Sequence, residues 1–440
     1  MSRAVAELAL PIVGVNVGMM LMGAVDTLMV GRLSPEALAA VALGNVYFFA
    51  FTIVAIGILL ALDPLITHAL GAKDHGDVER AVQRGLVLAG LLSIPVIGSL
   101  LLAGPVLGAL GQPAEVVPLA GLYDRVLVWG ILPFLAFNVF RQTLQAHHIV
   151  APVLWTILAA NLLNIGLNWV LIFGQLGLPA MGVAGSAWAT NISRWFMALM
   201  LLGMSRRTLW PTLHPWHGDV FSLRPLGRVL RLGLPIGLQL ELEYGAFAAV
   251  AVLMGRFGTI QVAGHQIALN LASLTFMVPM GIGMAAAVVV GRAVGANDAP
   301  TARTAARAAL LMGTGFMACC SIVLLLAPRV FAGLYTTDAA VLAWAATLIP
   351  IAGIFQVFDG IQAVSVGILR GFGDTRAPML INLVGFGVVG IGASLLLAFR
   401  TPLGAIGLWW GLVIGLAAVA VVLVARIRVM VRRPMARVRA

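Results

Sequence analysis

The sequence predicts an all-α polytopic membrane protein with about twelve transmembrane helices in two six-helix lobes, which are related by a parallel internal repeat. Three observations predict this fold class. Hydrophobic residues make up 61% of the chain and charged residues 10%, whereas a soluble domain has roughly 25% charged residues. Apolar runs of about 20 residues, the length of a helix that crosses a bilayer, recur to the end of the chain. Short sequence matches recur at a nearly constant offset of 224 residues.

The apolar runs set the expected spans. Hydropathy places them near 9–31, 38–67, 82–109, 118–146, 152–174, 182–204, 229–256, 261–292, 303–333, 340–369, 377–398 and 404–425. A membrane barrel would show alternating segments of about 10 residues instead. We expect no cleavable signal peptide, because the first apolar run continues past signal length.

The longest polar break divides the chain. It covers 205–228 and separates two groups of six spans. This predicts an N-terminal lobe at 1–204, a linker at 205–228, a C-terminal lobe at 229–425 and a basic tail at 426–440.

The two lobes share sequence matches in the same order. Segments 10–32 and 234–256 both begin Leu-Pro-Ile and end Gly-Arg, and GAKD at 71–74 matches GAND at 295–298. Because six is an even number of spans, both copies cross the membrane in the same direction. Such a parallel repeat places a substrate site between the halves, near the middle of the bilayer.

The basic residues predict the orientation. The net charge of +11 is concentrated in one set of loops and in the tail, while the opposite face has chiefly Arg32, Arg256, Arg329 and Arg400. The positive-inside rule therefore places both termini and the linker in the cytoplasm. We expect the basic tail to lie against anionic lipid headgroups, and we do not expect nucleic acid as a partner.

Acidic residues inside apolar spans are the main candidates for function. A charge at the centre of a membrane helix costs about 2.5–3.5 kcal/mol on insertion scales, so it usually faces a protein interior or a cavity. Asp26 is such a residue in the first span, and Asn164 and Asn168 are four apart in the fifth span, on one helix face. Asparagine amides can bond a protonated acid or offer oxygens to Na⁺. The alternative is ordinary hydrogen bonding between helices.

Glu243 and Asp359 are the strongest candidates in the C-terminal lobe. If the two residues approach each other, two carboxylates in a low dielectric cannot easily both stay ionised. Either a proton is retained or a monovalent cation, for example Na⁺, lies between them. The alternative is that they are buried for packing or folding specificity.

Four further residues are secondary candidates. Glu241 points about 160° away from Glu243 around the helix, toward the central cleft or a neighbouring polar span. Gln356 precedes Asp359 by three residues, and His265 is interior, where a hydrogen-bonded structural role is the more common one. Asp63 is followed by Pro64, which leaves an upstream carbonyl unpaired and favours an opening of the helix.

Motifs of enzymes and nucleotide-driven pumps are missing from the sequence. There is no GxxxxGK[ST] loop, HExxH, nucleophile elbow or Cys/His metal spacing. The adjacent Cys319 and Cys320 lie in an apolar span and are expected to pack as small residues. The sequence therefore predicts no enzyme and no cofactor other than a coupling ion, Na⁺ or H⁺.

The chain resembles the multidrug and toxic compound extrusion (MATE) family, in particular its NorM-like branch. The resemblance covers nearly the whole chain. It is carried by VDTLMVGRL at 25–33, LNIGLNWVLIFG at 163–174, GVAGSAWAT at 182–190, RLGLPIGLQLELEYGAF at 231–247, GHQIALN at 264–270 and GILRGFGDTRAP at 367–378.

The resemblance implies export of organic, often cationic, compounds across the bacterial inner membrane, coupled to inward flow of Na⁺ or H⁺. It places cation-coupling positions at Glu243 and Asp359, and at Asp26 with Asn164 and Asn168. Some relatives have Asp at the position of Asn168, and an aromatic hydroxyl at the position of Phe355. The resemblance therefore does not decide whether the coupling ion is Na⁺ or H⁺. A related flippase for lipid-linked sugars is the alternative, although the intramembrane charges are mainly acidic. Nothing in the sequence requires the protein to be more than a monomer.

Overall fold

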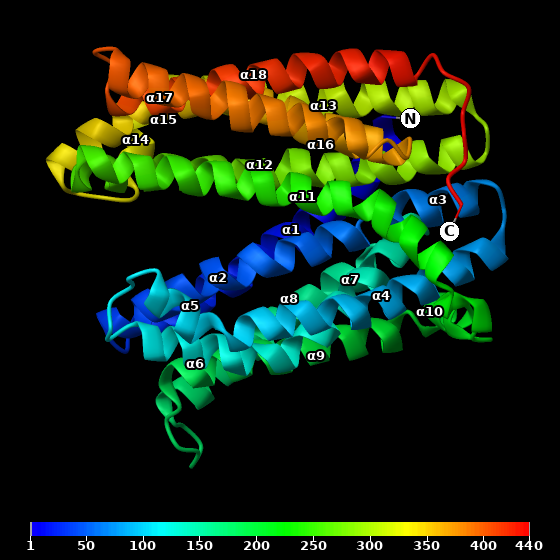
Figure 1. Ribbon diagram of the computed structural model, residues 1–440, viewed down its shortest axis with the longest axis horizontal. Coiled ribbons are helices and arrows are strands. Elements are labelled where there is room, and N and C mark those ends of the chain that lie inside the picture. The colour runs from blue at the N-terminus through cyan, green and yellow to red at the C-terminus, as the bar shows by residue number, and fades with distance from the viewer. Residues whose placement is uncertain (1, 440) are drawn as a thin grey trace. The chain divides into compact units, whose positions relative to one another are not determined.

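The computed structural model describes residues 2–439, and this part of the chain is helical with no strand. The first half contains α1 Ser2–Val30, α2 Pro35–Leu59, α3 Leu62–Gly71, α4 His75–Leu101, α5 Ala103–Ala109, α6 Val117–Leu127, η1 Val128–Gly130, α7 Ile131–Ala146, α8 Ala151–Phe173, α9 Gly182–Met204, α10 Arg206–Leu213 and η2 Gly218–Phe221. Figure 1 labels the helices.

The second half begins with the long helix α11. It contains α11 Leu223–Met254, η3 Gly255–Phe257, α12 Thr259–Gly295, α13 Ala299–Leu326, α14 Pro328–Gly333, α15 Ala339–Gly371, α16 Arg376–Asn382, the π-helix η4 Leu383–Gly390, α17 Ile391–Arg400 and α18 Ala405–Met430.

Eleven helical segments within residues 2–439 are long and apolar enough to cross a membrane. They coincide with all the predicted spans except 182–204. That span forms α9, a helix of 23 residues whose hydropathy is lowered by Thr190, Asn191, Ser193 and Arg194. With α9 included, the fold matches the predicted helical membrane protein.

Several predicted spans are interrupted. The second span consists of α2 and α3, and the break at 60–61 lies just before Asp63 and Pro64, as predicted from the proline. The third and ninth spans each end in a short helix, α5 and α14, after breaks at Leu102 and Ala327. The eleventh span contains η4, whose sequence LVGFGVVG is rich in glycine.

The backbone repeats the sequence repeat. Lys73 and Asn297 are 224 residues apart, and both have positive φ, of 58° and 56°. The next residues, Asp74 and Asp298, cap α4 and α13 with similar angles, φ −98° and ψ 85° against φ −100° and ψ 83°. Each aspartate accepts a hydrogen bond of 3.1 Å from the backbone N–H three residues later. The two halves therefore share local geometry as well as sequence.

The chain packs as two compact units. Unit 1 contains α1 as far as Val13, Gly71–Lys73 and Leu238–Val438, and unit 2 contains Gly14–Leu70 and Asp74–Gly237. The division falls two residues after a proline in both α1 and α11, at Pro11 and Pro235. The first helix of each half is therefore divided at an equivalent position, rather than at the linker.

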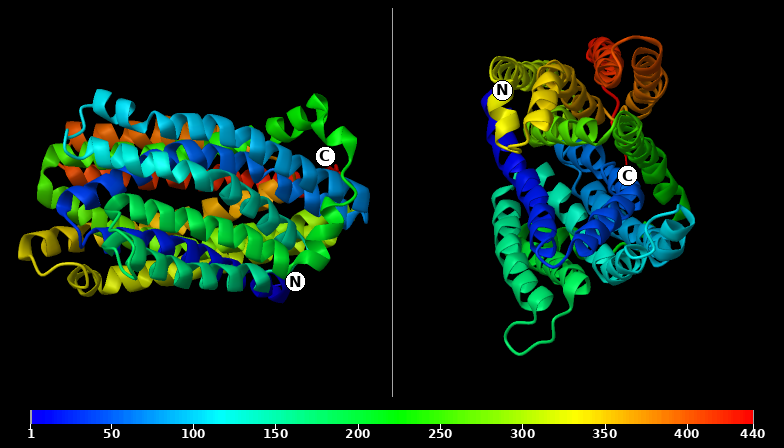
Figure 2. Two further views of the ribbon diagram at one scale, coloured as in Figure 1. Left: turned by 90° about the horizontal axis from the view of Figure 1, so that it is seen from below. Right: turned by 90° about the vertical axis from the view of Figure 1, so that its left-hand side faces the viewer.

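Each unit is a bundle of long helices, which Figure 2 shows from two further directions. In unit 1, α15 packs against α12, α13 and α18, and in unit 2, α9 packs against α6, α7 and α8. Close approach of α12 and α15 depends on glycine, because a Cβ at Gly367 would overlap the backbone of Gly283.

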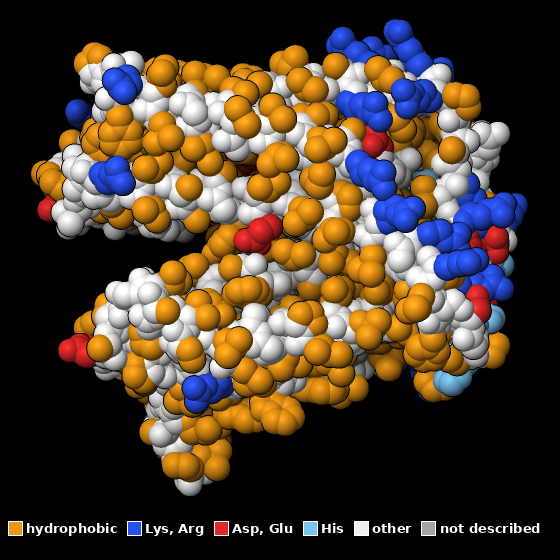
Figure 3. All heavy atoms as spheres, viewed as in Figure 1, with side chains coloured by type: hydrophobic (Ala, Val, Ile, Leu, Met, Phe, Trp, Pro, Cys, Tyr) orange, Lys and Arg blue, Asp and Glu red, His pale blue; other side chains and the backbone are white. Residues whose placement is uncertain are grey.

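The predicted linker is ordered and largely helical. Residues 205–228 form α10, η2 and the first turns of α11. Asp219 of η2 pairs with Arg84 of α4, with 2.7 Å between Oδ2 and Nη2. On the face shown in Figure 3, Lys and Arg side chains gather near the end of α18 in unit 1 and near α10 in unit 2.

Candidate functional site: buried carboxylates and amides

Asp26 is the centre of a polar network inside unit 2. Its side chain is 3% exposed. Asn168 donates from Nδ2 to Oδ1 of Asp26 across 2.6 Å, and Thr190 donates its hydroxyl to Oδ2 across 2.8 Å. Asn168 also donates to Oδ1 of Asn164 at 3.0 Å. The network thus joins α1, α8 and α9, and it contains the three cation-coupling residues predicted for this half.

The second network lies inside unit 1 and is built on Glu243 of α11. Gln239, one turn earlier, donates to Oε1 of Glu243 at 3.0 Å, and Gln362 of α15 donates to the same oxygen at 2.6 Å. Gln362 also donates to Oδ1 of Asn382 at 3.1 Å. Asn382 in turn donates to the carbonyl of Pro378 at 2.8 Å, at the end of α16.

Asp359 lies three residues before Gln362 on α15 and is 8% exposed. Asp359 interacts electrostatically with Glu243, so the two acids lie near each other. Glu243 also interacts electrostatically with Arg370. Aromatic rings pack beside this network, with Phe355 at centroid distances of 5.9 Å from both Phe247 and Trp409.

The secondary candidates lie apart from these two networks. Gln356 accepts a hydrogen bond of 2.9 Å from Thr275 of α12 and makes no bond to Glu243. Oε2 of Glu241 is buried without a hydrogen-bond partner among residues 2–439. Asp63 is 3% exposed in α3, and its charge interacts with that of Arg141 in α7.

His265 differs from the hydrogen-bonded structural role that its position suggested. It is 1% exposed, and neither ring nitrogen has a hydrogen-bond partner in the described part of the chain. Its ring instead packs edge-on against Trp409, with 5.6 Å between the centroids.

Four members of the networks are absent from the sequence-based prediction: Thr190, Gln239, Gln362 and Asn382. Two of them could have been predicted from their helical spacing. Gln239 precedes Glu243 by four residues and Gln362 follows Asp359 by three, so each shares a helix face with a predicted acid. Thr190 and Asn382 had no such spacing, because neither shares a helix with the acid of its network.

The donor set around Glu243 fits a monovalent cation. Carboxylate and amide oxygens are what a hard cation takes as ligands, and Glu243, Asp359, Gln362 and Asn382 supply them. No group of three or more His, Cys, Asp or Glu side chains suited to a metal ion occurs within residues 2–439.

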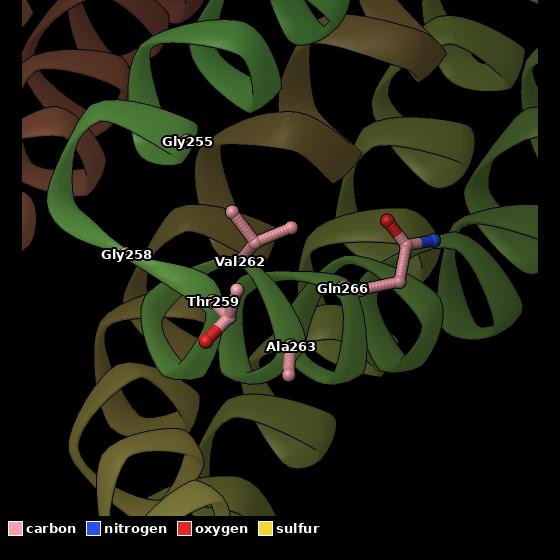
Figure 4. A pocket seen from close by; sticks show the side chains of 6 residues that line it. All are labelled: Gly255, Gly258, Thr259, Val262, Ala263 and Gln266. Atoms are coloured by element: carbon pink, nitrogen blue, oxygen red, sulfur yellow. The ribbon is translucent and has the colours of Figure 1, made fainter. Parts of the chain in front are cut away.

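A separate pocket opens at the start of α12 (Figure 4). Its volume is about 570 Å³, and it is lined by Gly255, Gly258, Thr259, Val262, Ala263 and Gln266. It contains none of the predicted coupling residues, although Gln266 directly follows His265.

A helical bundle that holds hydrogen-bonded carboxylates inside its apolar helices has the architecture of a membrane transporter. The MatE family model matches residues 11–170 and 235–396, so the chain belongs to the MatE family of transporters and is not an enzyme. The two matched segments begin 224 residues apart, at Pro11 and Pro235, which is the offset of the internal repeat.

Curated relatives and solved structures agree with this family. "Probable multidrug resistance protein NorM" of Rhizobium meliloti (strain 1021) is 38% identical over 433 residues, which cover 96% of this chain and 92% of that protein. "Multidrug resistance protein NorM" of Burkholderia vietnamiensis is 37% identical over 431 residues, 95% of this chain and 92% of that protein.

Solved transporters of the family share the fold. The crystal structure of a eukaryotic MATE transporter superimposes with a TM-score of 0.89 at 24% identity, covering 98% of this chain and 97% of that one. A MATE family transporter of the MOP superfamily in an outward-facing conformation gives a TM-score of 0.87 at 22% identity, covering 98% and 96%.

Proposed function

We propose that this protein exports organic, often cationic, compounds and drives the export by inward flow of a monovalent cation, Na⁺ or H⁺. The observation that carries the proposal is the buried network of unit 1, in which two glutamine amides bond Glu243 and Asp359 interacts with Glu243 electrostatically. Curated relatives named as multidrug resistance proteins support the substrate class. They do not favour a flippase for lipid-linked sugars.

The acid pair provides a physical basis for coupling. Two carboxylates that repel each other in a low dielectric bind one cation strongly, because the cation removes the repulsion. A bound cation drives alternating access only if the two end states of the carrier bind it with different affinity. We infer that the ion and the organic cation use the same negative charge in turn. Aromatic rings beside the acids, such as Phe247 and Phe355, suit a lipophilic cation.

The test is ethidium transport by the purified protein in liposomes, with a Na⁺ gradient and a pH gradient imposed separately. Glu243→Gln and Asp359→Asn should each abolish gradient-driven transport while leaving expression and folding intact. Glu241→Gln is the matched control on the same helix and should retain transport. Wild-type transport by both E243Q and D359N would overturn the ion assignment.

We also propose an orientation in the bacterial inner membrane with both termini and the 205–228 linker in the cytoplasm. The gathering of Lys and Arg side chains near α10 and the end of α18 supports it, because basic residues stay on the cytoplasmic side. The basic tail would then face anionic lipid headgroups. Reporter fusions at the C-terminus and at 214–217 should both report the cytoplasm, and a periplasmic signal from either would contradict the orientation.

A further inference from the structure

Arg194 of α9 is a buried cation inside unit 2. It is 8% exposed. Its guanidinium carbon lies over two aromatic rings, 4.5 Å from the centroid of Phe48 and 4.8 Å from that of Phe134. Nη1 is buried and has no hydrogen-bond partner among residues 2–439. A guanidinium in such surroundings needs compensation, because an uncompensated charge inside an apolar bundle is costly.

The compensation comes from the ring faces and from the network around Asp26. Arg194 interacts electrostatically with Tyr123 and Asp26. It follows Thr190 by four residues, so it lies one helical turn beyond the hydroxyl that bonds Oδ2 of Asp26. Of Tyr123 and Asp26, Asp26 is the carboxylate, whereas a tyrosine hydroxyl is ordinarily neutral. The charge that balances Arg194 is therefore that of Asp26.

The Asp26 network otherwise has the chemistry of a sodium site. Asp26 contributes two carboxylate oxygens, Thr190 a hydroxyl and Asn164 an amide oxygen. Oδ1 of Asn168 is buried and has no hydrogen-bond partner among residues 2–439. Oxygen atoms of these types are the ligands of hard cations. This network differs from a sodium site in its charge, because its one acid, Asp26, interacts with an arginine, Arg194.

The network in unit 1 has a different charge balance. There two acids, Glu243 and Asp359, interact with each other, and one arginine, Arg370, interacts with Glu243. With all three groups ionised, one negative charge remains, whereas Asp26 and Arg194 cancel. A monovalent cation would neutralise the first network and would leave a net positive charge in the second.

We propose that Arg194 is a tethered counter-cation that takes the electrostatic place of a coupling ion beside Asp26. The oxygens around Asp26 then hold no ion during transport, and the coupling ion is confined to Glu243 and Asp359. Asp26 and Arg194 act as a fixed, charge-balanced pair. The location of the coupling ion at Glu243 and Asp359 rests on the proposed function. The role of Arg194 does not, because it rests on the geometry of unit 2.

The test is binding of ²²Na⁺ to the purified full chain in lipid nanodiscs at alkaline pH, where protons compete least. Arg194→Gln removes the charge and should raise bound ²²Na⁺ by one equivalent per protein, about twofold if the wild type binds one. Arg194→Lys keeps the charge and should bind as the wild type does. R194Q/D26N should lose the additional equivalent.

Asp26→Asn in the otherwise wild-type chain tests the role of Arg194 without changing the arginine, so the proposal can be refuted even if R194Q misfolds. The D26N variant should bind as much ²²Na⁺ as the wild type. Reduced binding in D26N, or no gain in folded R194Q, would overturn the role of Arg194. A wild type that binds no ²²Na⁺ would count against Na⁺ at Glu243 and Asp359, while a gain in R194Q would still support the tethered cation.

Discussion

Asn168 and Asp26 form the shortest link between α8 and α1 in the polar network of unit 2, with 2.6 Å between Nδ2 and Oδ1. The same amide nitrogen donates to Asn164. The Asn168 side chain therefore bonds both Asp26 and Asn164, and it links α8 to α1.

Replacing this asparagine should weaken both folding and transport. Asn168→Leu removes a hydrogen bond to a carboxylate, a contact worth about 1.5–3 kcal/mol, and leaves Asp26 with Thr190 alone. We expect a lower melting temperature in detergent and a loss of ethidium transport in liposomes. Asn161→Leu on the same helix is the control, because its amide bonds only backbone carbonyls. Transport and stability of N168L equal to those of the wild type would refute the network.

Gln362 should matter more than Gln356, although both lie three residues from Asp359. Gln362→Met loses the bonds to Glu243 and Asn382, and a bond to a charged group is worth enough to change a rate about tenfold. We expect gradient-driven ethidium transport to fall by about that factor. Gln356→Met loses a bond to Thr275 only and serves as the control. Equal losses in the two variants would contradict the assignment.

The sequence predicted the acids but only part of their surroundings. Asp26, Glu243 and Asp359 stood out because a charge in an apolar span is rare, and Asn164 and Asn168 because their spacing puts them on one face. Gln356 and Gln362 flank Asp359 symmetrically along the helix, so periodicity alone cannot choose between them. The choice depends on which helix packs beside each face, and in the structure α12 faces Gln356 while α11 faces Gln362.

Arg194 shows a second limit of sequence reasoning. It is a charge within an apolar span, and the same rule that selected the acids applies to it, but its partners Phe48 and Phe134 lie on distant helices. The breaks in the second span were easier to predict, because Pro64 acts on its own chain. Local chemistry is thus readable from sequence, while contacts between helices depend on the packed fold.

Gly367 of α15 should not tolerate a side chain. A Cβ there would overlap the backbone of Gly283 on α12, and forced separation of packed helices costs about 1–3 kcal/mol. We expect Gly367→Ala to lower the melting temperature in detergent and the yield of folded protein. Gly315→Ala on α13 is the control, because a Cβ at Gly315 meets nothing within 4 Å. A melting temperature of G367A at or above that of G315A would show that the helices can separate without cost.

Gln83 of α4 should keep the linker folded. It is fully buried, and its amide donates to the carbonyls of Thr212 and Pro215, at 3.1 and 3.0 Å. It also accepts a bond of 2.9 Å from the backbone N–H of His217. Gln83→Ala leaves these three backbone groups unpaired, so α10 should unfold more often and become a better substrate for trypsin at the exposed Arg206 and Arg207.

The matched control for the linker is Arg80→Gln. Arg80 approaches Asp219 at 3.5 Å with 40% of its side chain exposed, and exposed pairs contribute at most about 1 kcal/mol. Trypsin cleavage at 206–207 should therefore be faster in Q83A and unchanged in R80Q. Cleavage of Q83A at the wild-type rate would show that other contacts hold the linker.

Asp298 should make the stability of α13 depend on pH. Its carboxylate accepts a hydrogen bond of 3.1 Å from the backbone N–H of Thr301, and hydrogen bonding to Thr301 holds the pKa of Asp298 below its usual range. Because the folded-state pKa is depressed, the cap stabilises fully above the ordinary aspartate pKa of about 4, and this contribution is lost as the pH falls through the lower folded pKa. Asp298→Ala should lower the melting temperature at about pH 7, and the difference from the wild type should shrink toward about pH 3. Asp298→Asn keeps an uncharged cap, so its difference from D298A should not change with pH in this way. A difference between wild type and D298A that persists or widens in acid would show that the ionised carboxylate is not what stabilises the start of α13.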